Sequence, residues 1–234
     1  MRMMRVCIAR SNRRVGSCLA AIAASLLAGC MGNLEDVLAR REVEREALAK
    51  TTADRVTASA SCCANYRTIT FRPMPLGLEQ EVVLSASSPV FDFPFGRSRF
   101  EAFELPPLTT GERLRVKAIE LISGPTAKPI YRPALVLLSE NFEPIEVRPS
   151  LAFDDRFSGW DFEGHEADLA IDAARARARY LIVAADPAFI GGAYLRRAHT
   201  TVIPAGGTYV STAAPDQRFQ YGYEGRSLVE LVSH

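Results

Sequence analysis

Segments in which apolar and polar residues alternate recur along the chain after residue 60. The clearest is RLRVKAIELI (113–122), in which apolar and basic side chains take turns. A period of two is typical of a strand that is buried on one face, because successive side chains point to opposite sides of a sheet. The expected buried face carries Leu114, Val116 and Ala118, and the expected exposed face carries Arg113, Arg115 and Lys117.

Further strand-like segments lie between breaks that are rich in Gly, Pro and Ser. Several short strands at this spacing favour an antiparallel β-sandwich over alternating strands and helices. We therefore predict a mainly all-β fold, with an antiparallel β-sandwich domain over residues 61–234. The expected strands are RTITF (67–71), EQEVVL (79–84), RSRFEAFEL (97–105), RLRVKAIELI (113–122), RPALVLLS (132–139), RYLIVAAD (179–186) and SLVELVS (227–233).

Two later segments have less regular patterns. Residues 198–211, AHTTVIPAGGTYVS, predict a hairpin around Gly206 and Gly207. Residues 166–179 are rich in alanine and fit either a short helix or a strand followed by a turn. Both interpretations stay open at this point.

A highly charged segment with a thin apolar stripe precedes the predicted sandwich. Residues 34–55 contain neither Gly nor Pro, and acidic and basic residues interleave along them. This pattern indicates a surface helix with ion pairs between successive turns. We expect residues 30–60 to form a helical stalk or linker, with a short oligomerising helix as the alternative.

The first 29 residues have the layout of an export signal. Five arginines and no acid precede a mostly Ala, Leu and Ile run from Val15 to Gly29. This run is shorter than the roughly 20 apolar residues of a membrane span. A basic start followed by a short apolar run is typical of signal peptides. We therefore expect residues 1–29 to be cleaved.

The end of that run, Leu27-Ala28-Gly29-Cys30, resembles a bacterial lipobox. In lipoproteins, the cysteine after such small residues becomes the first mature residue and carries the lipid. Two or more acyl chains such as palmitate hold a protein stably on a membrane, whereas one chain binds only marginally. The resemblance therefore predicts lipidation at Cys30. Because Met31 follows instead of an aspartate, it also implies an outer-membrane anchor that faces the periplasm.

Cleavage before Cys30 changes the charge balance of the chain. The signal takes five of the 28 basic residues and none of the 27 acidic residues, so the formal charge falls from +1 to −4. A mildly acidic protein lacks the basic surface with which proteins bind nucleic acid. We therefore expect no nucleic-acid partner.

Cys62 and Cys63 are the cysteines that remain after the signal and Cys30. Neighbouring cysteines bond only through a strained ring, because their spacing is shorter than that of most disulfides. Two interpretations stay open: a vicinal disulfide, which the oxidising periplasm permits, and two small packed thiols. A metal site is not expected, since two sulfurs without nearby His or Cys do not complete a tetrahedral ligand set.

The segment FDFPFGRSRF (91–100) combines alternating phenylalanines with two turn-forming residues. Pro94 opposes a helix and favours the edge of a sheet, and Gly96 permits a tight turn. We expect the alternating rings to point to one face and to form the hydrophobic plug and corner of the sandwich. These rings are Phe91, Phe93 and Phe95.

Two places in the sequence are candidates for ligand binding. Arg97 and Arg99 could flank a groove beside the phenylalanine rings. Trp160 next to Asp161 could stack on the apolar face of a sugar while the carboxylate binds hydroxyl groups, since binding pockets combine aromatic walls with a few polar groups. The plainer alternative is that both places belong to the core or to a solvated acidic loop.

The sequence contains no recognisable constellation of catalytic residues. His165, His199 and His234 accompany neither a Gly-x-Ser-x-Gly elbow nor a nucleotide-binding glycine loop. The seven acidic residues from Asp154 to Asp172 lack the spacing of an EF-hand. We therefore expect no enzymatic activity, no cofactor and no metal.

Four segments together resemble the MalM family of maltose operon periplasmic proteins. They are CCANYRTITFRPMPLG, SSPVFDFPFGRSRFEAFELP, ARYLIVAADPAFIGG and YGYEGRSLVELV, of which FDFPFGRS is the most specific. The resemblance covers about residues 60–233. It implies a largely β-sheet periplasmic protein that is linked to maltodextrin uptake and has no established enzyme activity. The lipobox is a departure from that family.

These observations together predict a MalM-like lipoprotein that is anchored in the outer membrane and faces the periplasm. We expect a non-enzymatic accessory or binding protein in the handling of maltodextrin or another carbohydrate. The alternative is an interaction module of the cell envelope, in which the sandwich docks an outer-membrane or secretion partner.

Overall fold

The computed structural model divides the chain into two units, Met1–Arg45 and Glu46–His234. At residues 119, 154–158, 162–165, 195, 196, 199–205, 208–214, 217 and 218 the structure describes the backbone without the side chains. The structure describes residues 46–119, 130–158, 162–196, 199–205, 208–214 and 217–233, together with residues 36, 39, 40, 43 and 44.

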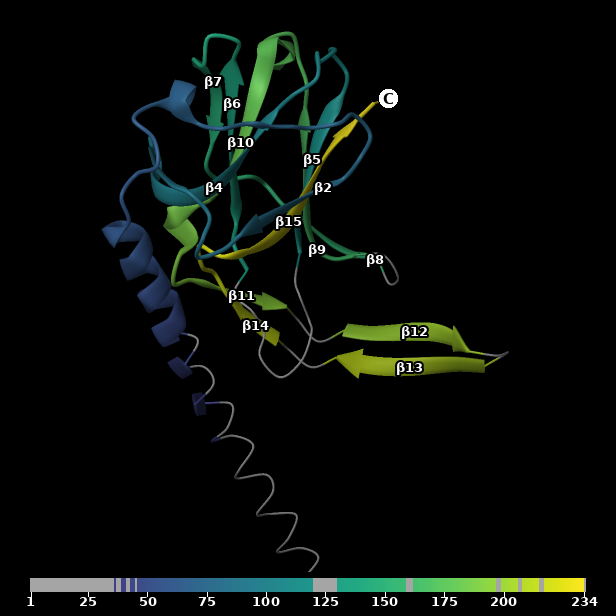
Figure 1. Cartoon of the computed structure of the whole chain (residues 1–234). Coiled ribbons are helices and arrows are strands. Elements are labelled where there is room, and N and C mark those ends of the chain that lie inside the picture. Colours follow the sequence, from purple (N-terminus) through teal and green to yellow (C-terminus); the bar gives the residue numbers. More distant parts are fainter. Residues whose placement is uncertain are drawn as a thin grey trace, which may run out of the picture. The chain divides into compact units, whose positions relative to one another are not determined.

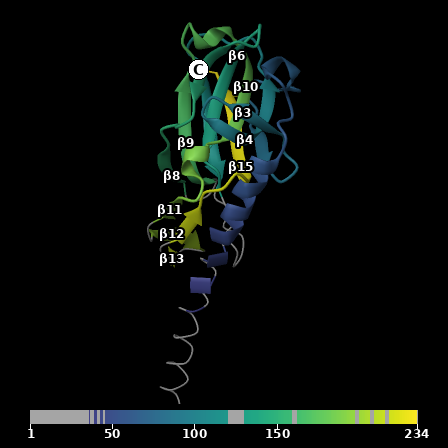
Figure 2. The ribbon, with the colours of Figure 1, turned by 90° about the vertical axis from the view of Figure 1, so that its left-hand side faces the viewer.

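Two sheets dominate the second unit (Figure 1 and Figure 2). The first sheet has the strand order β1-β4-β10-β6-β7, with β3 paired to β4, and the second has the order β2-β15-β5-β9-β8. Among the described strand pairs, only β1 and β4 run parallel. The first sheet comprises β1 (Arg72–Pro73), β3 (Val90–Phe93), β4 (Gly96–Glu104), β6 (Pro133–Ser139), β7 (Pro144–Arg148) and β10 (Ala178–Ala185). The second comprises β2 (Gln80–Leu84), β5 (Arg113–Ile119), β8 (Asp154–Ser158), β9 (Phe162–Ala170) and β15 (Gly225–Val232).

The two sheets share one apolar core. Leu114 and Val116 of β5 pack in the same cluster as Leu181 and Val183 of β10, and none of the four is more than 1 % exposed. The residues between them on β5 are half-buried, and Arg115 forms an ion pair with Asp168 of β9 at 3.2 Å. The predicted antiparallel β-sandwich and the two faces of residues 113–118 are therefore confirmed.

The first sheet is buried on its outer face as well. Val136 of β6 and Ile182 of β10 point away from the core between the sheets and pack against Phe91 and Phe93. Residues 61–71 complete this second cluster, which includes Tyr66 and Phe71. Burial on both faces explains why β6 and β10 are almost continuously apolar and do not alternate. The predicted role of the phenylalanines as a hydrophobic plug is confirmed for Phe91 and Phe93.

The corner at the end of β3 is a tight hairpin. Phe93 pairs with Gly96, so that Pro94 and Phe95 form the turn between β3 and β4. The Phe95 ring stacks on Phe93 at 5.0 Å with its plane tilted by 3°. Gly96 has a φ of 125°, a conformation in which only glycine is comfortable. The turn predicted for this segment is therefore present.

The strand predicted for RTITF is wrong. Residues Tyr66–Thr68 form a 3₁₀ turn, η1, because Asn65 and Thr68 cap it reciprocally. The Asn65 side chain accepts a hydrogen bond from the backbone N–H of Arg67 at 3.0 Å. Such local side-chain hydrogen bonds compete with a sheet ladder. The chain first enters the sheet at β1.

The two less regular segments are resolved by the structure. Strand β9 continues to Ala170 and is followed by a turn and the 3₁₀ turn η2 (Arg175–Arg177), so a strand followed by a turn is the correct alternative for residues 166–179. Strands β12 (His199–Ala205) and β13 (Thr208–Ala214) form the predicted hairpin. A second small ladder joins β11 (Ala193–Arg196) and β14 (Gln217–Gln220).

A helix over residues 46–58 belongs to the same compact unit as the sandwich (Figure 1). Val56 is fully buried in the core cluster, and Ala49 is only 5 % exposed. The compact unit therefore begins at Glu46, earlier than the boundary at residue 61 that the sequence suggested. Within the described residues, no helix has the length and apolar character needed to cross a membrane.

Candidate functional site

A small hollow lies beside the start of β6, between the second sheet and the β11–β14 ladder. Its volume is about 110 Å³. Most of its lining is apolar, with Ala118, Ile130 and Pro133 between larger side chains. Four aromatic residues and one arginine give the hollow its chemical character: Tyr131, Phe153, Tyr194, Tyr221 and Arg132.

Backbone hydrogen bonds fix one wall of the hollow. Ile130 donates its N–H to the carbonyl of Gln220 at 3.1 Å and accepts a hydrogen bond from Gly222 at 2.8 Å. On the other side of this segment, the N–H of Tyr221 donates to the carbonyl of Gly192 at 2.9 Å. The lining residue Tyr221 is thus held between two loops that are far apart in the sequence.

The Tyr131 side chain is fixed between the two sheets. It is 1 % exposed, and its hydroxyl shares a short hydrogen bond with that of Ser227 on β15. Burial raises the pKa of Tyr131 far above its usual range. Tyr131 is therefore a neutral structural residue at neutral pH.

Arg132 is the charged member of the lining. Its guanidinium lies over the ring of Phe189 at 4.3 Å and faces Phe153 at 5.5 Å. One terminal nitrogen donates to the carbonyl of Leu151 at 2.9 Å. Its Nε is buried and has no hydrogen-bond partner among the described residues. Stacking between rings orients a guanidinium and leaves its edge available for hydrogen bonds.

Asp186 lies close behind Arg132 but is already bonded. One carboxylate oxygen accepts the N–H of Ala188 at 3.0 Å and so caps η3 (Pro187–Phe189), while the other accepts the hydroxyl of Ser150 at 3.4 Å. Burial raises the pKa of Asp186, and these hydrogen bonds and the charge of Arg132 lower it in part. Asp186 supports the wall that carries Phe189.

This arrangement is suited to binding. Aromatic faces can pack against an apolar ring face, and the guanidinium edge can donate to an acceptor on the same ligand. Neither a carboxylate nor an imidazole, the usual general bases, is among the residues that the structure places in the lining.

Arg97, a predicted ligand-contacting residue, connects parts of the fold. Its guanidinium makes two parallel hydrogen bonds to Asp92, at 2.7 and 2.9 Å. The same group donates to the carbonyls of Thr57 and Ser59 at the end of the helix, at 2.8 and 3.0 Å. A cation at the carboxyl end of a helix is favourable. These contacts explain Arg97 without a ligand.

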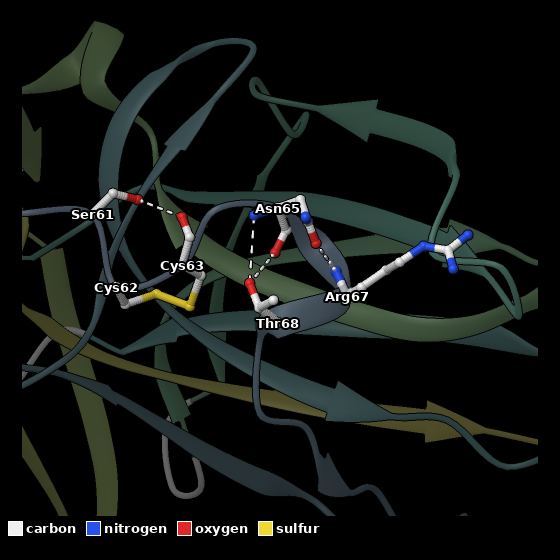
Figure 3. The surroundings of a disulfide bond; sticks show 6 residues. All are labelled: Ser61, Cys62, Cys63, Asn65, Arg67 and Thr68. Atoms are coloured by element: carbon white, nitrogen blue, oxygen red, sulfur yellow. Dashed lines mark hydrogen bonds between the residues drawn. A yellow bond between two sulfur atoms is a disulfide. The ribbon is translucent and has the colours of Figure 1, made fainter.

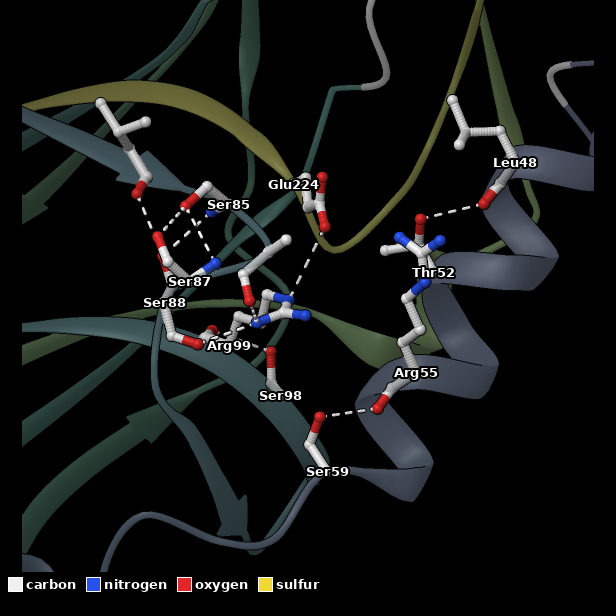
Figure 4. Close-up of polar contacts among 12 residues, drawn as sticks. Leu48, Thr52, Arg55, Ser59, Ser85, Ser87, Ser88, Ser98, Arg99 and Glu224 are labelled. Atoms are coloured by element: carbon white, nitrogen blue, oxygen red, sulfur yellow. Dashed lines mark hydrogen bonds and ion pairs between the residues drawn. The ribbon is translucent and has the colours of Figure 1, made fainter.

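Arg99, its predicted companion, is buried (Figure 4). It donates to the carbonyls of Ala86 and Ser88, both at 2.8 Å, and its Nε lies 3.9 Å from a carboxylate oxygen of Glu224. Arg99 therefore ties the loop before β3 to the segment before β15. Neither Arg97 nor Arg99 lines the hollow.

The adjacent cysteines form a disulfide, the first of the two interpretations that the sequence left open (Figure 3). Cys62 is exposed, and its N–H donates to the carbonyl of Val90 at 2.8 Å. Cys63 is half-buried against the outer aromatic cluster, and its carbonyl accepts the hydroxyl of Ser61 at 3.0 Å. The pair thus fixes the segment that covers the first sheet.

The other candidates lie outside the described residues. Cys30, Trp160, Asp161 and His234 are among them, and only the backbone is described for His165 and His199. Sugar contact by Trp160 and Asp161 and lipidation of Cys30 stay predictions. Among the side chains that are described, no group of three or more His, Cys, Asp or Glu could hold a metal ion.

Sequence reasoning did not identify the residues of the hollow. Arg132 stands at the start of a predicted strand, and Phe153, Tyr194 and Tyr221 are isolated aromatic residues in three other segments. No spacing links them, because the fold brings them together. One feature of the sequence pointed to this region: Tyr221, and Phe189 next to Arg132, fall in segments on which the predicted resemblance to the MalM family rests.

Comparisons with protein-family models, with curated proteins and with solved structures gave no match for this chain.

Proposed function

We propose that this chain is a MalM-like lipoprotein of the outer membrane that faces the periplasm and binds a carbohydrate without catalysing a reaction. The observation that carries the binding half is the hollow, with aromatic walls and a single cationic donor group. Sugars offer apolar C–H faces to aromatic rings and hydroxyl groups to polar side chains. The family resemblance supplies the ligand class, maltodextrin or another carbohydrate, and the lipobox supplies the location.

Calorimetric titration of the full chain, purified from membranes in detergent, tests the binding half. We expect saturable binding of an oligosaccharide from a panel that begins with maltodextrins. Tyr194→Ala, in the lining, should weaken binding at least tenfold, whereas Tyr180→Ala, a half-buried tyrosine outside the lining, should not. Absence of binding for every sugar at millimolar concentration would contradict the proposal.

Mass spectrometry of the mature protein tests the anchor. We expect the amino-terminal residue to be an acylated Cys30, and the Cys30→Ser variant to leave the membrane fraction. An unacylated mature terminus would overturn the anchor without affecting the carbohydrate proposal.

A docking role is the second candidate, and exposed apolar residues near β2 favour it. Leu76, Leu78 and Val83 are 49 %, 59 % and 41 % exposed. The phenylalanines of residues 91–100 do not form such an exposed surface, because Phe91, Phe93 and Phe100 are buried. Large exposed apolar patches mark interfaces. Recovery of the same envelope partner by the wild-type chain and by Leu78→Asp would argue against docking here.

A further inference from the structure

We infer that the hollow selects a ligand that presents a carboxylate to Arg132, so that the carbohydrate class it takes is an acidic sugar, a uronate, and not a neutral glucan. This inference rests on the proposed function and narrows its ligand class. It is carried by the charge partners of three arginines whose Nε is buried, by the lining of the hollow and by the size of the hollow.

Three arginines of the described chain have a buried Nε without a hydrogen-bond partner: Arg99, Arg132 and Arg226. They differ in their charge partners. The Nε of Arg99 lies 3.9 Å from Glu224, and Arg226 forms an ion pair with Glu81. Arg132 makes no ion pair with any described residue, and its direct hydrogen bond goes to an uncharged carbonyl.

A guanidinium without a direct ion-pair partner is costly where water has limited access. Stacking between Phe189 and Phe153 lowers that cost in part. Asp186, the carboxylate behind Arg132, has both oxygens occupied by other donors. A carboxylate supplied by a ligand would give the guanidinium the direct ion-pair partner that no described residue provides.

Among the described lining residues, Arg132 is the one that carries a charge, and the others are aromatic or aliphatic. A neutral sugar would leave the guanidinium without a direct ion-pair partner. Charge-assisted hydrogen bonds are about twice as strong as neutral ones. The difference between an acidic sugar and its neutral analogue should therefore be large at this site.

The volume fits one end of a sugar ring. The hollow measures about 110 Å³, whereas an enclosed cavity of about 150 Å³ holds a benzene molecule. The carboxylate and the adjacent ring edge can enter, and the lining residues Tyr194 and Tyr221 can pack against the ring. A uronate carries its carboxylate at the end of the ring, as this geometry requires.

Paired sugars that differ only in the carboxylate test the inference. The full chain in detergent is titrated with D-galacturonate against D-galactose and with D-glucuronate against D-glucose. We expect the uronate of each pair to bind at least tenfold more tightly, with a difference that shrinks as salt is added. In the same titration, the Nε–H resonance of Arg132 should shift with the uronate only.

Two variants assign the effect to this residue. Arg132→Gln should abolish the preference for the uronate, whereas Arg67→Gln, which removes an exposed positive charge elsewhere, should preserve it. If Arg132→Gln fails to fold, the paired titrations and the arginine resonance of the wild-type chain decide the question.

The outcomes separate the inference from the proposed function. Equal binding of uronate and neutral sugar, or an unchanged preference in folded Arg132→Gln, would overturn the inference and leave carbohydrate binding standing. Binding of no sugar at all would overturn both. Tighter binding of the uronate that depends on Arg132 would support both.

Discussion

Asp186 places a carboxylate where little water reaches it. The residue is 1 % exposed, and burial raises its pKa above the ordinary value of 3.8. The N–H of Ala188, the hydroxyl of Ser150 and the charge of Arg132 oppose that rise in part. Tyr223 also faces Asp186, and its own pKa is raised by burial and by this carboxylate. The cap of η3 therefore depends on a carboxyl group that is costly to ionise.

The variant Asp186→Asn should reveal this cost as a dependence on pH. Asn keeps the acceptor for Ala188 but cannot ionise. Since the folded pKa of Asp186 is raised, its contribution to stability is full below about pH 3.8 and is lost as the pH rises through the raised value. Relative to the variant, the wild type should gain about 1.4 kcal/mol for each unit of the rise as the pH falls. Urea unfolding at a series of pH values measures the unfolding free energies of the wild type and the variant. A difference between them that stays constant with pH would contradict the prediction.

Gly96 and Gly77 offer a matched pair for backbone strain. At Gly96, a φ of 125° combines with a position where an added Cβ would lie 3.2 Å from Pro187, whereas Gly77 has a φ of 69° and open space. We expect Gly77→Ala to cost about 1 kcal/mol of unfolding free energy and Gly96→Ala to cost about 2–3 kcal/mol. Urea unfolding compares the two, and equal costs would mean that the contact with Pro187 is unimportant.

At the scale of elements, the edge strand β2 is closed by side chains from the opposite sheet. Glu101 of β4 accepts the N–H of Val83 at 2.8 Å. Arg72 donates to the carbonyl of Glu81 and also pairs with Glu101, both at 2.7 Å. Unpaired backbone groups on an edge invite pairing with other chains. The Arg72–Glu101 pair therefore both joins the sheets and protects an edge.

Removing this closure should cost stability and solubility together. We expect Glu101→Ala to lower the unfolding free energy by about 1–3 kcal/mol, since it leaves Val83 and Arg72 without their acceptor. It should also increase light scattering on incubation. Glu140→Ala, an exposed acid in the β6–β7 turn, should change stability by less than about 0.5 kcal/mol. If Glu101→Ala changed neither the unfolding free energy nor the light scattering, solvent would replace the carboxylate without cost.

The alternation of apolar and polar residues predicted strands well where one face of the strand is exposed. The pattern of residues 113–118 translated directly into β5, because Arg115 and Lys117 face away from the core. The apolar strands β6 and β10 were also found, but their continuous pattern did not reveal that a second cluster covers them. At RTITF, the β-branched residues suggested a strand, while the caps from Asn65 and Thr68 decided the local structure.

The candidate site was largely beyond prediction from the sequence. Arg97 and Arg99 were candidates because they lie next to aromatic residues in the sequence. Their partners are carbonyls and acids elsewhere in the sequence, which no local pattern predicts. The hollow depends on tertiary contacts between the start of β6 and the loop that carries Tyr221. Adjacent cysteines, by contrast, permitted a correct suggestion of a disulfide because the bond is local.

At the scale of the whole molecule, β15 is an internal strand of the second sheet although it is the last strand that the structure describes. It pairs with β2 on one side and with β5 on the other. Ser227, Val229 and Leu231 are at most 1 % exposed. Without β15, β2 would lose its described ladder partner, and the apolar core would open.

Truncation after Glu224 should therefore abolish cooperative unfolding of the sandwich. We expect the shortened chain to show no sigmoidal transition in urea and to be cleaved rapidly by protease, because an internal strand and its buried side chains are missing. Removal of Ser233 and His234 alone should leave the transition within about 0.5 kcal/mol of the wild type. A cooperative transition in the chain truncated at Glu224 would contradict a central role for β15.

The position of β15 also sets an order of events during synthesis. The ribosome makes β15 long after β2, so β2 must wait for the intervening polypeptide before its partner exists. Pairing across such a separation is slow to form. On the proposal that this chain is exported, a translocation channel that accepts only extended chains would act on it before the second sheet is complete, and β15 would close that sheet after passage.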